Sequence, residues 1–278
     1  MDSDSPARRG RLHGFSINRL IPNILTLAAL CSGLTAIRFA LQGEMRLAVI
    51  AIIVAAIFDA LDGRVARRLG VTSRFGAELD SLSDFLCFGV TPALVLYLAS
   101  LKDGGALGWV VTLMFPICSA LRLARFNTAL VSDTPPPAWT GSFFTGVPAP
   151  AGALLALIPL MVSFEIEAAW PRHALVVGAV LVAVGGLMVS RIPTYSFKKG
   201  RVPRHLVLPS LLGAALVMGV LASAPWIAGS LIGLAYVSLI PFSWIAYRRQ
   251  AAQDRRAEAH SGEVVSLRSV DSGSSTPG

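Results

Sequence analysis

Long apolar stretches separated by short polar segments dominate the sequence from about residue 21 to residue 247. The stretches are continuously apolar and do not alternate in period two, so they predict helices and not the strands of a β-barrel. Most of them approach the roughly 20 residues that a helix needs to cross the hydrocarbon core of a bilayer. We therefore expect an all-α fold, a polytopic membrane helix bundle with about eight transmembrane helices. The predicted spans are Pro22–Leu41, Leu47–Leu61, Leu79–Ser100, Ala106–Leu123, Gly146–Phe164, His173–Ile192, His205–Ser223 and Pro225–Tyr247.

Polar composition divides the chain into three parts. Residues 1–20 form a basic segment that we expect in the cytoplasm, and residues 21–247 form the predicted transmembrane domain. Residues 248–278 form a charged and then Ser- and Gly-rich cytoplasmic tail. Such a tail has too few apolar residues to bury a core, so we expect it to be disordered.

Basic residues lie mainly on one side of the predicted spans. With the N-terminus in the cytoplasm, 20 of the 24 Lys and Arg residues fall in cytoplasmic segments. The positive-inside rule therefore predicts that both termini are cytoplasmic, in a multi-pass protein of the inner or plasma membrane. The net charge of +8 follows from these flanking residues, so we expect no nucleic-acid partner.

Four aspartates stand in or beside the second and third predicted spans, where an ionisable side chain costs about 2.5–3.5 kcal/mol and by default marks function. Asp59 and Asp62 are three residues apart and Asp80 and Asp84 four apart, so each pair shares one helix face. The short connection makes the two helices antiparallel neighbours, and all four carboxylates can converge near the cytoplasmic surface. Two divalent cations would balance the four charges, and oxygen ligands favour Mg²⁺ or Mn²⁺. The pattern predicts a two-metal site for phosphate chemistry.

An alternative is that the aspartates form salt bridges with arginines of the connection. The candidates are Arg64, Arg67, Arg68 and Arg74. Some pairing is expected, but salt bridges alone do not explain two acidic pairs in register that flank Gly63 and Gly76.

The segment from Asp59 to Asp84 resembles the motif of the CDP-alcohol phosphotransferase family, Asp-x2-Asp-Gly-x2-Ala-Arg-x8-Gly-x3-Asp-x3-Asp. All its fixed positions are filled, by Asp59, Asp62, Gly63, Ala66, Arg67, Gly76, Asp80 and Asp84. This many identities at fixed spacing across two helices are a specific signal. The resemblance implies an enzyme that makes a phospholipid from a CDP-activated lipid with two divalent cations, Mg²⁺ or Mn²⁺.

The resemblance also implies roles for the four aspartates. Asp59 and Asp80 would contact both metals, Asp62 the first and Asp84 the second. Asp84 would also be the catalytic base that accepts the proton of the acceptor hydroxyl.

Binding of the CDP-lipid is implied for five further residues. Gly63 would let the nucleotide approach the backbone, Arg67 would hold the diphosphate, and Ser73 would touch the CDP moiety. Asn23 and Thr26, at the start of the first span, resemble the segment that lines the family's cytidine pocket. Alternatively, these two residues cap the first helix.

Three other segments resemble the phosphatidylserine synthase branch of the family: Ala120–Asn127, Phe144–Pro150 and Ser190–Ser196. The resemblance covers about residues 18–245. It implies CDP-diacylglycerol and L-serine as substrates, phosphatidylserine and CMP as products, and a homodimer in the bilayer.

Two arginines of the first of these segments are candidates to bind the carboxylate of serine. Arg122 and Arg125 are three residues apart on one helix face, and Asn127 could add a hydrogen bond. Alternatively, both arginines are ordinary positive-inside anchors at the end of a span.

Two other functions compete with serine transfer. The motif also suits another acceptor alcohol, namely glycerol 3-phosphate, inositol phosphate or choline. A phosphorylated acceptor would need a richer basic pocket, and choline would need an aromatic cage. A divalent-cation transporter is the more remote alternative, because the acidic cluster occurs once, near one surface, and without the repeats typical of transporters.

Overall fold

The computed structural model describes residues 20–71, 73–130, 143–190, 193–195 and 223–240, with a few isolated positions between 209 and 243. These parts are helical except for two short strands, so the expectation of an all-α fold is confirmed in its main feature. The basic N-terminal segment, most of the predicted span His205–Ser223 and the C-terminal tail lie outside the described residues.

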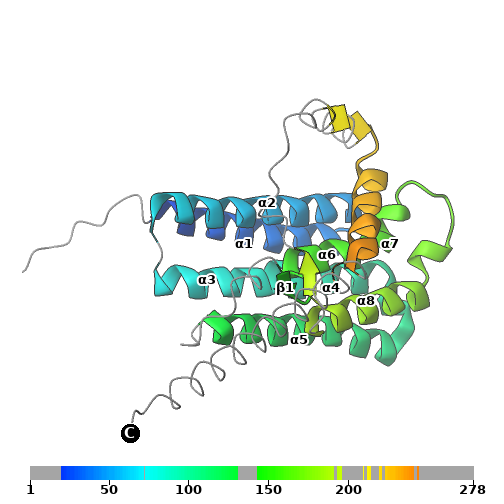
Figure 1. Cartoon of the computed structure of the whole chain (residues 1–278). Coiled ribbons are helices and arrows are strands. Elements are labelled where there is room, and N and C mark those ends of the chain that lie inside the picture. Colours follow the sequence, from blue (N-terminus) through cyan, green and yellow to red (C-terminus); the bar gives the residue numbers. More distant parts are fainter. Residues whose placement is uncertain are drawn as a thin grey trace, which may run out of the picture.

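Helices α1 (Leu20–Leu41) and α2 (Met45–Leu69) form an antiparallel hairpin (Figure 1). The chain reverses at Gly43, whose φ of 83° is a left-handed conformation that glycine adopts without a Cβ clash. Small side chains allow the helices to approach closely, and Ser32 of α1 donates a hydrogen bond to the Ala51 carbonyl of α2 at 2.8 Å. The buried residues of α1 are Pro22, Thr26, Ala29, Gly33, Ala36 and Ala40.

The chain continues as a helical run that widens twice from an α-helix to a π-helix. It comprises α3 (Arg74–Asp84), the π-helical η2 (Phe85–Val90), α4 (Thr91–Leu96) and the π-helical η3 (Tyr97–Leu101). Pro92 has no N–H to donate to the carbonyl of Phe88, and this missing bond accounts for the wider turn of η2.

Polar side chains of this run bond to the backbone of α1. Ser83 Oγ, Cys87 Sγ and Thr91 Oγ1 donate in turn to the carbonyls of Thr26 (3.4 Å), Ala29 (3.3 Å) and Gly33 (3.5 Å). A Cβ on Gly33 would lie 2.6 Å from the sulfur of Cys87, so the seam has no room for a side chain there. The seam fixes the end of α3 against the first half of α1.

The rest of the helical bundle packs beside this run. The short 3₁₀ turn η4 (Lys102–Gly104) leads into α5 (Gly105–Leu130), which packs against α8 (Ala174–Val189). The short 3₁₀ turn η6 (Trp170–Arg172) precedes α8.

The predicted span Gly146–Phe164 contains two helices, α6 (Ala149–Ala156) and α7 (Ile158–Val162). They are separate because Pro159 cannot donate to the carbonyl of Leu155.

Two strands are the exception to the helical fold. β1 (Phe143–Thr145) pairs antiparallel with β2 (Pro193–Tyr195), with Phe144 opposite Thr194. Gly146 follows β1 with a φ of 78°, and a Cβ there would lie 2.6 Å from the Met188 carbonyl oxygen of α8. The ladder therefore brings together two of the segments that resemble the phosphatidylserine synthase branch.

Among the described residues, two helical stretches are long and apolar enough to cross a membrane, Leu20–Leu41 and Arg74–Thr128. Ala174–Val189 and Pro225–Ile240 are shorter apolar helices. Figure 1 shows α1, α2, α3, α5 and α8 running along one direction, whereas the helix at residues 225–240 (orange) runs across it. The count of eight spans and their orientation stay predictions.

Candidate active site

The turn between α2 and α3 sets the position of the candidate site. Gly70 follows α2 in a left-handed conformation (φ 63°, ψ 24°), and its N–H donates to the carbonyl of Ala66. Ser73 caps α3, because its Oγ accepts a hydrogen bond from the N–H of Gly76 at 3.0 Å. The connection between the two caps is short, and the aspartates of α2 and α3 face one another.

The aspartates of α2 and α3 form one cluster. One carboxylate oxygen from each of Asp59, Asp62 and Asp80 lies within 4.8 Å of the others. The carboxyl group of Asp84 lies against that of Asp59. Two carboxylates in contact are stable only with a proton or a cation between them. Because the cluster offers several oxygen ligands at this separation, its donor set fits Mg²⁺ or Mn²⁺.

Asp62 is held by a residue of α1. Its side chain is 5% exposed, and the hydroxyl of Thr26 donates to its Oδ2 at 2.6 Å. Asn23 and Thr26 both lie inside α1, which already includes Leu20. The alternative that they cap this helix is therefore wrong.

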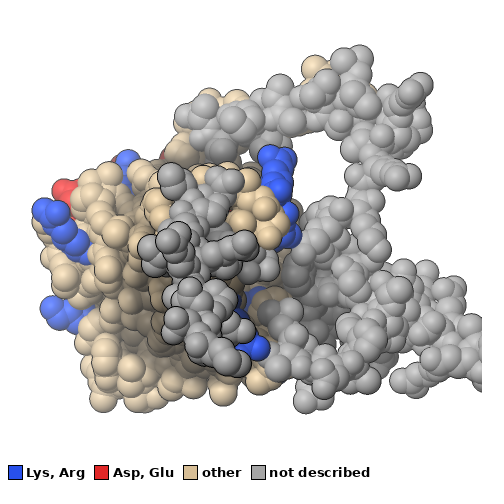
Figure 2. All heavy atoms as spheres, turned by 90° about the vertical axis from the view of Figure 1, so that its left-hand side faces the viewer, with Lys and Arg blue, Asp and Glu red and all other residues tan. Residues whose placement is uncertain are grey.

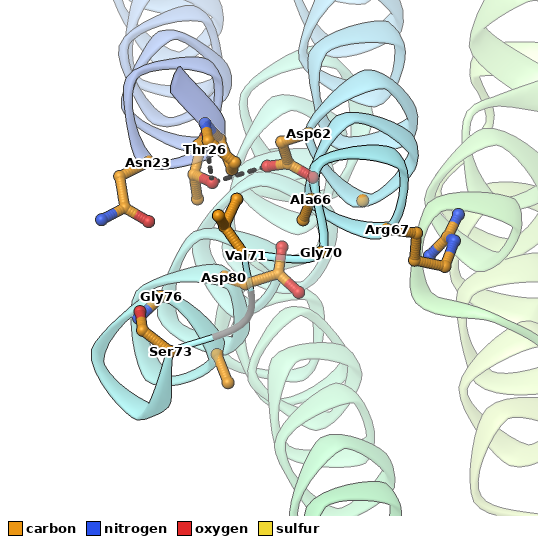
Figure 3. A pocket seen from close by; sticks show the side chains of 13 residues that line it. Asn23, Thr26, Asp62, Ala66, Arg67, Gly70, Val71, Ser73, Gly76 and Asp80 are labelled. Carbon is orange, nitrogen blue, oxygen red and sulfur yellow. Dashed lines mark hydrogen bonds between the residues drawn. The ribbon is translucent and has the colours of Figure 1, made fainter. Parts of the chain in front are cut away.

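A cavity of about 350 Å³ lies beside Asp62 and Asp80 (Figure 3). It extends from the first turns of α1 to the turn between α2 and α3. All the residues predicted to bind the CDP-lipid line it, namely Asn23, Thr26, Gly63, Arg67 and Ser73. The structure thus brings these residues to one place, and their binding roles stay predictions.

Two glycines of the motif leave room for polar side chains of the cavity wall. A Cβ on Gly76 would lie 2.9 Å from Oδ1 of Asn23 and 3.1 Å from Oγ of Ser73. A Cβ on Gly63 would lie 3.3 Å from Nη1 of Arg67, so the guanidinium folds back over this glycine. Figure 3 shows Arg67 across the cavity from Asn23 and Ser73. Gly63 therefore accommodates Arg67 itself here, in addition to its predicted role toward the nucleotide.

The three residues of α5 that were predicted to bind the acceptor have different neighbours. Arg122 interacts electrostatically with Asp84, and its Nε is buried with no hydrogen-bond partner among the described residues. Arg125 donates to the carbonyl of Val189, the last residue of α8, at 2.8 Å. Asn127 donates through Nδ2 to Oγ of Ser81 at 3.0 Å. Of the three, Arg122 retains an unpaired donor near the aspartates.

Two of these partners were not found by sequence reasoning. Ser81 lies in a variable position of the motif, directly after Asp80, and this adjacency was its only signal. Val189 contributes a backbone carbonyl, for which no side-chain pattern exists.

Exposed arginines surround the end of the bundle where α2 ends and α3 begins. They are Arg64, Arg67, Arg68 and Arg74. Figure 2 views this end and shows far more basic than acidic side chains at the described surface. Arg64 donates to the Ala60 carbonyl of its own helix at 3.1 Å. Arg67 interacts electrostatically with Asp62, so part of the expected pairing between arginines and aspartates is present.

A family model and several relatives of known name match this chain. The model of the CDP-alcohol phosphatidyltransferase family matches residues 19–188, and the chain belongs to this family. It is 37% identical over 264 residues to the CDP-diacylglycerol--serine O-phosphatidyltransferase of Mycobacterium leprae (strain TN), covering 93% of this chain and 87% of that protein.

Two further relatives are more distant. A protein of the same name from Helicobacter pylori (strain ATCC 700392 / 26695) is 33% identical over 198 residues, which cover 71% of this chain and 81% of that protein. The archaetidylserine synthase of Methanothermobacter thermautotrophicus is 33% identical over 176 residues, which cover 62% of this chain and 68% of that protein. The resemblance inferred from the motif is thus confirmed.

Proposed function

We propose that this protein transfers the phosphatidyl group of CDP-diacylglycerol to the hydroxyl of L-serine, giving phosphatidylserine and CMP. The observation that carries this proposal is the cluster of Asp59, Asp62 and Asp80 beside a cavity of about 350 Å³ in a chain of the CDP-alcohol phosphatidyltransferase family. A cavity of this size lies in the range of small-ligand sites. It suits the nucleotide part of CDP-diacylglycerol, whose acyl chains would stay in the bilayer. The names of the relatives support serine as the acceptor.

The proposed reaction uses the roles that the family resemblance implies for the aspartates. Asp84 accepts the proton of the serine hydroxyl, whose oxygen forms a bond to the phosphorus that carries the diacylglycerol. The bond from this phosphorus to the oxygen of CMP breaks, and CMP leaves with the electron pair. Divalent cations held by the aspartates would supply the positive charge that neutralises the diphosphate and the departing CMP. Asp59 and Asp80 would hold both ions, Asp62 the first and Asp84 the second.

The nucleotide side of the site is assigned to the cavity wall. Asn23 and Ser73 stand on the same side of the cavity and offer polar atoms to the CDP moiety. Arg67, from across the cavity, holds the diphosphate through its planar fork of donors.

The acceptor side is assigned to Arg122, which binds the serine carboxylate. Its Nε is buried and unpaired among the described residues, and its guanidinium interacts with Asp84, the proposed base. Arg125 and Asn127 already bond to Val189 and Ser81, so we assign them a supporting role in the same pocket.

The membrane arrangement is part of the proposal. Residues 21–247 would cross the inner or plasma membrane about eight times, with residues 1–20 and 248–278 in the cytoplasm. Two long apolar helices and the exposed arginines beside the cavity support a multi-pass protein whose site faces the cytoplasm. A homodimer is also proposed, because the family resemblance implies one.

The test uses purified full-length protein in detergent micelles with CDP-diacylglycerol, Mg²⁺ or Mn²⁺ and labelled L-serine. Glycerol 3-phosphate, inositol phosphate and choline are assayed in parallel, and the ether-lipid analogue of the donor is included because a relative is named archaetidylserine synthase. We expect serine-dependent lipid labelling with equal CMP release, both abolished by EDTA.

CMP release with another alcohol but not with serine would replace the acceptor and keep the reaction class. No CMP release with any acceptor from folded protein would refute the enzymatic proposal.

A further inference from the structure

A short polar contact joins α1 to the aspartate cluster. Oγ1 of Thr26 lies 2.6 Å from Oδ2 of Asp62 and 3.1 Å from the carbonyl oxygen of Pro22. Thr26 is 4% exposed and Asp62 is 5% exposed, so protein atoms cover most of both side chains. The contact therefore lies inside the folded protein and not at its surface.

The hydroxyl of Thr26 donates its proton in the hydrogen bond to Asp62. A hydroxyl has one proton, and both potential partners of Thr26 are acceptors. The distance to Asp62 is typical of a charge-assisted O–H···O⁻ bond, which is about twice as strong as a neutral one. The Pro22 carbonyl is the weaker acceptor, at 3.1 Å.

The backbone of Thr26 is held as well. Its carbonyl accepts a hydrogen bond from Ser83 Oγ of α3 at 3.4 Å, one residue before Asp84. Thr26 thus connects α1 both to the aspartate pair of α2 and to the helix that carries the second pair. Through these two hydrogen bonds, the position of α1 helps to set the positions of the carboxylates.

We propose that Thr26 is a positioning residue for the metal ligand Asp62, and not a contact of the nucleotide. Its hydroxyl donates to Oδ2 and, together with the N–H of Gly63, orients the carboxylate toward the other aspartates. The proposal rests on the proposed function, because Asp62 binds a cation only if the cluster is a metal site. Groups that orient metal ligands typically change metal affinity by about 10–100-fold when they are removed.

The experiment measures Mn²⁺ binding directly on the purified full-length protein, without nucleotide or lipid donor, from the loss of the free-ion EPR signal. Thr26→Val keeps the shape and removes the hydroxyl, and Thr26→Ser restores it. We expect Thr26→Val to weaken Mn²⁺ binding about 10–100-fold and Thr26→Ser to stay within about threefold of the wild type. The activity of Thr26→Val should recover at raised Mn²⁺, which a folding defect would not do.

The matched control is Thr112→Val in α5. Thr112 is 2% exposed, and its hydroxyl donates to the Gly108 carbonyl of its own helix at 2.7 Å. It has the burial of Thr26 and the same bond to the residue four positions earlier, but no carboxylate partner. Its Mn²⁺ affinity should equal that of the wild type.

Three results would refute either the metal site or the positioning role of Thr26. If wild-type protein and Asp62→Asn bind Mn²⁺ equally weakly, the metal site itself is refuted, and with it the proposed function. If wild type binds and Thr26→Val binds equally well, the positioning role is refuted while the site stands. A raised KM for CDP-diacylglycerol in Thr26→Val with unchanged Mn²⁺ affinity would return Thr26 to the nucleotide pocket.

Discussion

The two sides of the candidate site are built differently. On the nucleotide side, Asn23, Ser73 and Gly76 pack tightly, and Thr26 reaches Asp62 at 2.6 Å. On the acceptor side, Arg122 keeps an unpaired donor among the described residues.

The neighbours of Arg122 are engaged with distant parts of the chain. Arg125 bonds to a carbonyl 64 positions away, and Asn127 to a side chain 46 positions away. The nucleotide side is thus preformed by α1 and the α2–α3 turn, whereas the acceptor side depends on how α5 packs against α8 and α3. In a family that shares its nucleotide donor, this separation would allow the acceptor alcohol to change while the donor pocket stays.

Asp84 contacts Asp59 and also interacts with Arg122 of the acceptor side. Its replacement should therefore have the largest effect. Asp84→Asn keeps the shape of the side chain but cannot accept the proton of serine. We expect kcat for CMP release to fall by about 10²–10⁴-fold, the range for a lost general base. The assay uses saturating serine, CDP-diacylglycerol and Mn²⁺. A rate near that of the wild type would mean that another group takes the proton.

The two arginines of α5 separate acceptor binding from packing. Arg122→Gln should raise the KM for serine about 10–100-fold, because a hydrogen bond to a charged partner contributes about 1.5–3 kcal/mol. Arg125→Gln loses its bond to the Val189 carbonyl and should mainly lower thermal stability, by about 1 kcal/mol. Kinetics at saturating CDP-diacylglycerol and a thermal melt measure the two effects. A larger rise of the KM for serine in Arg125→Gln than in Arg122→Gln would place the serine carboxylate beside α8.

Gly76 tests the tight packing of the nucleotide side. In Gly76→Ala the new Cβ would lie 2.9 Å from Oδ1 of Asn23, so this side chain must move. We expect the KM for CDP-diacylglycerol to rise by roughly 10-fold, about 1.4 kcal/mol of lost binding, with the KM for serine unchanged. The control is Gly186→Ala in α8, where a Cβ would meet no atom within 4 Å. Equal kinetics in the two variants would contradict a preformed nucleotide side.

Ser81 should produce the smallest effect, confined to the acceptor side. Ser81→Ala removes the acceptor of the Asn127 amide, a neutral hydrogen bond of about 0.5–1.5 kcal/mol. The KM for serine should rise only a few-fold, and that for CDP-diacylglycerol should not change. Ser238→Ala is the matched control, because among the described residues Ser238 donates to the Leu234 carbonyl of its own helix at 2.9 Å. A change in CDP-diacylglycerol binding instead would link Asn127 to the nucleotide side.

Some features of the fold could be predicted and others could not. The helical class followed from apolar stretches, because helix formation in an apolar environment is a local requirement of the backbone. The π-helical turns, the break before Pro159 and the β1–β2 ladder were not predicted. Proline marks a position where a helix is disturbed, but the surrounding packing selects a wider turn, as at Pro92, or a break.

The sequence by itself determined the family and the clustering of the aspartates of α2 and α3. Spacings of three and four residues put side chains on one helix face whatever the rest of the chain does, and a short connection makes the two helices neighbours.

The tertiary structure alone decided that Thr26 bonds to Asp62, that Gly63 accommodates Arg67, and that Arg122 and Arg125 have different partners. These contacts join helices that are distant in sequence, and their geometry depends on interhelical packing, about which the spacing of residues along one helix carries no information.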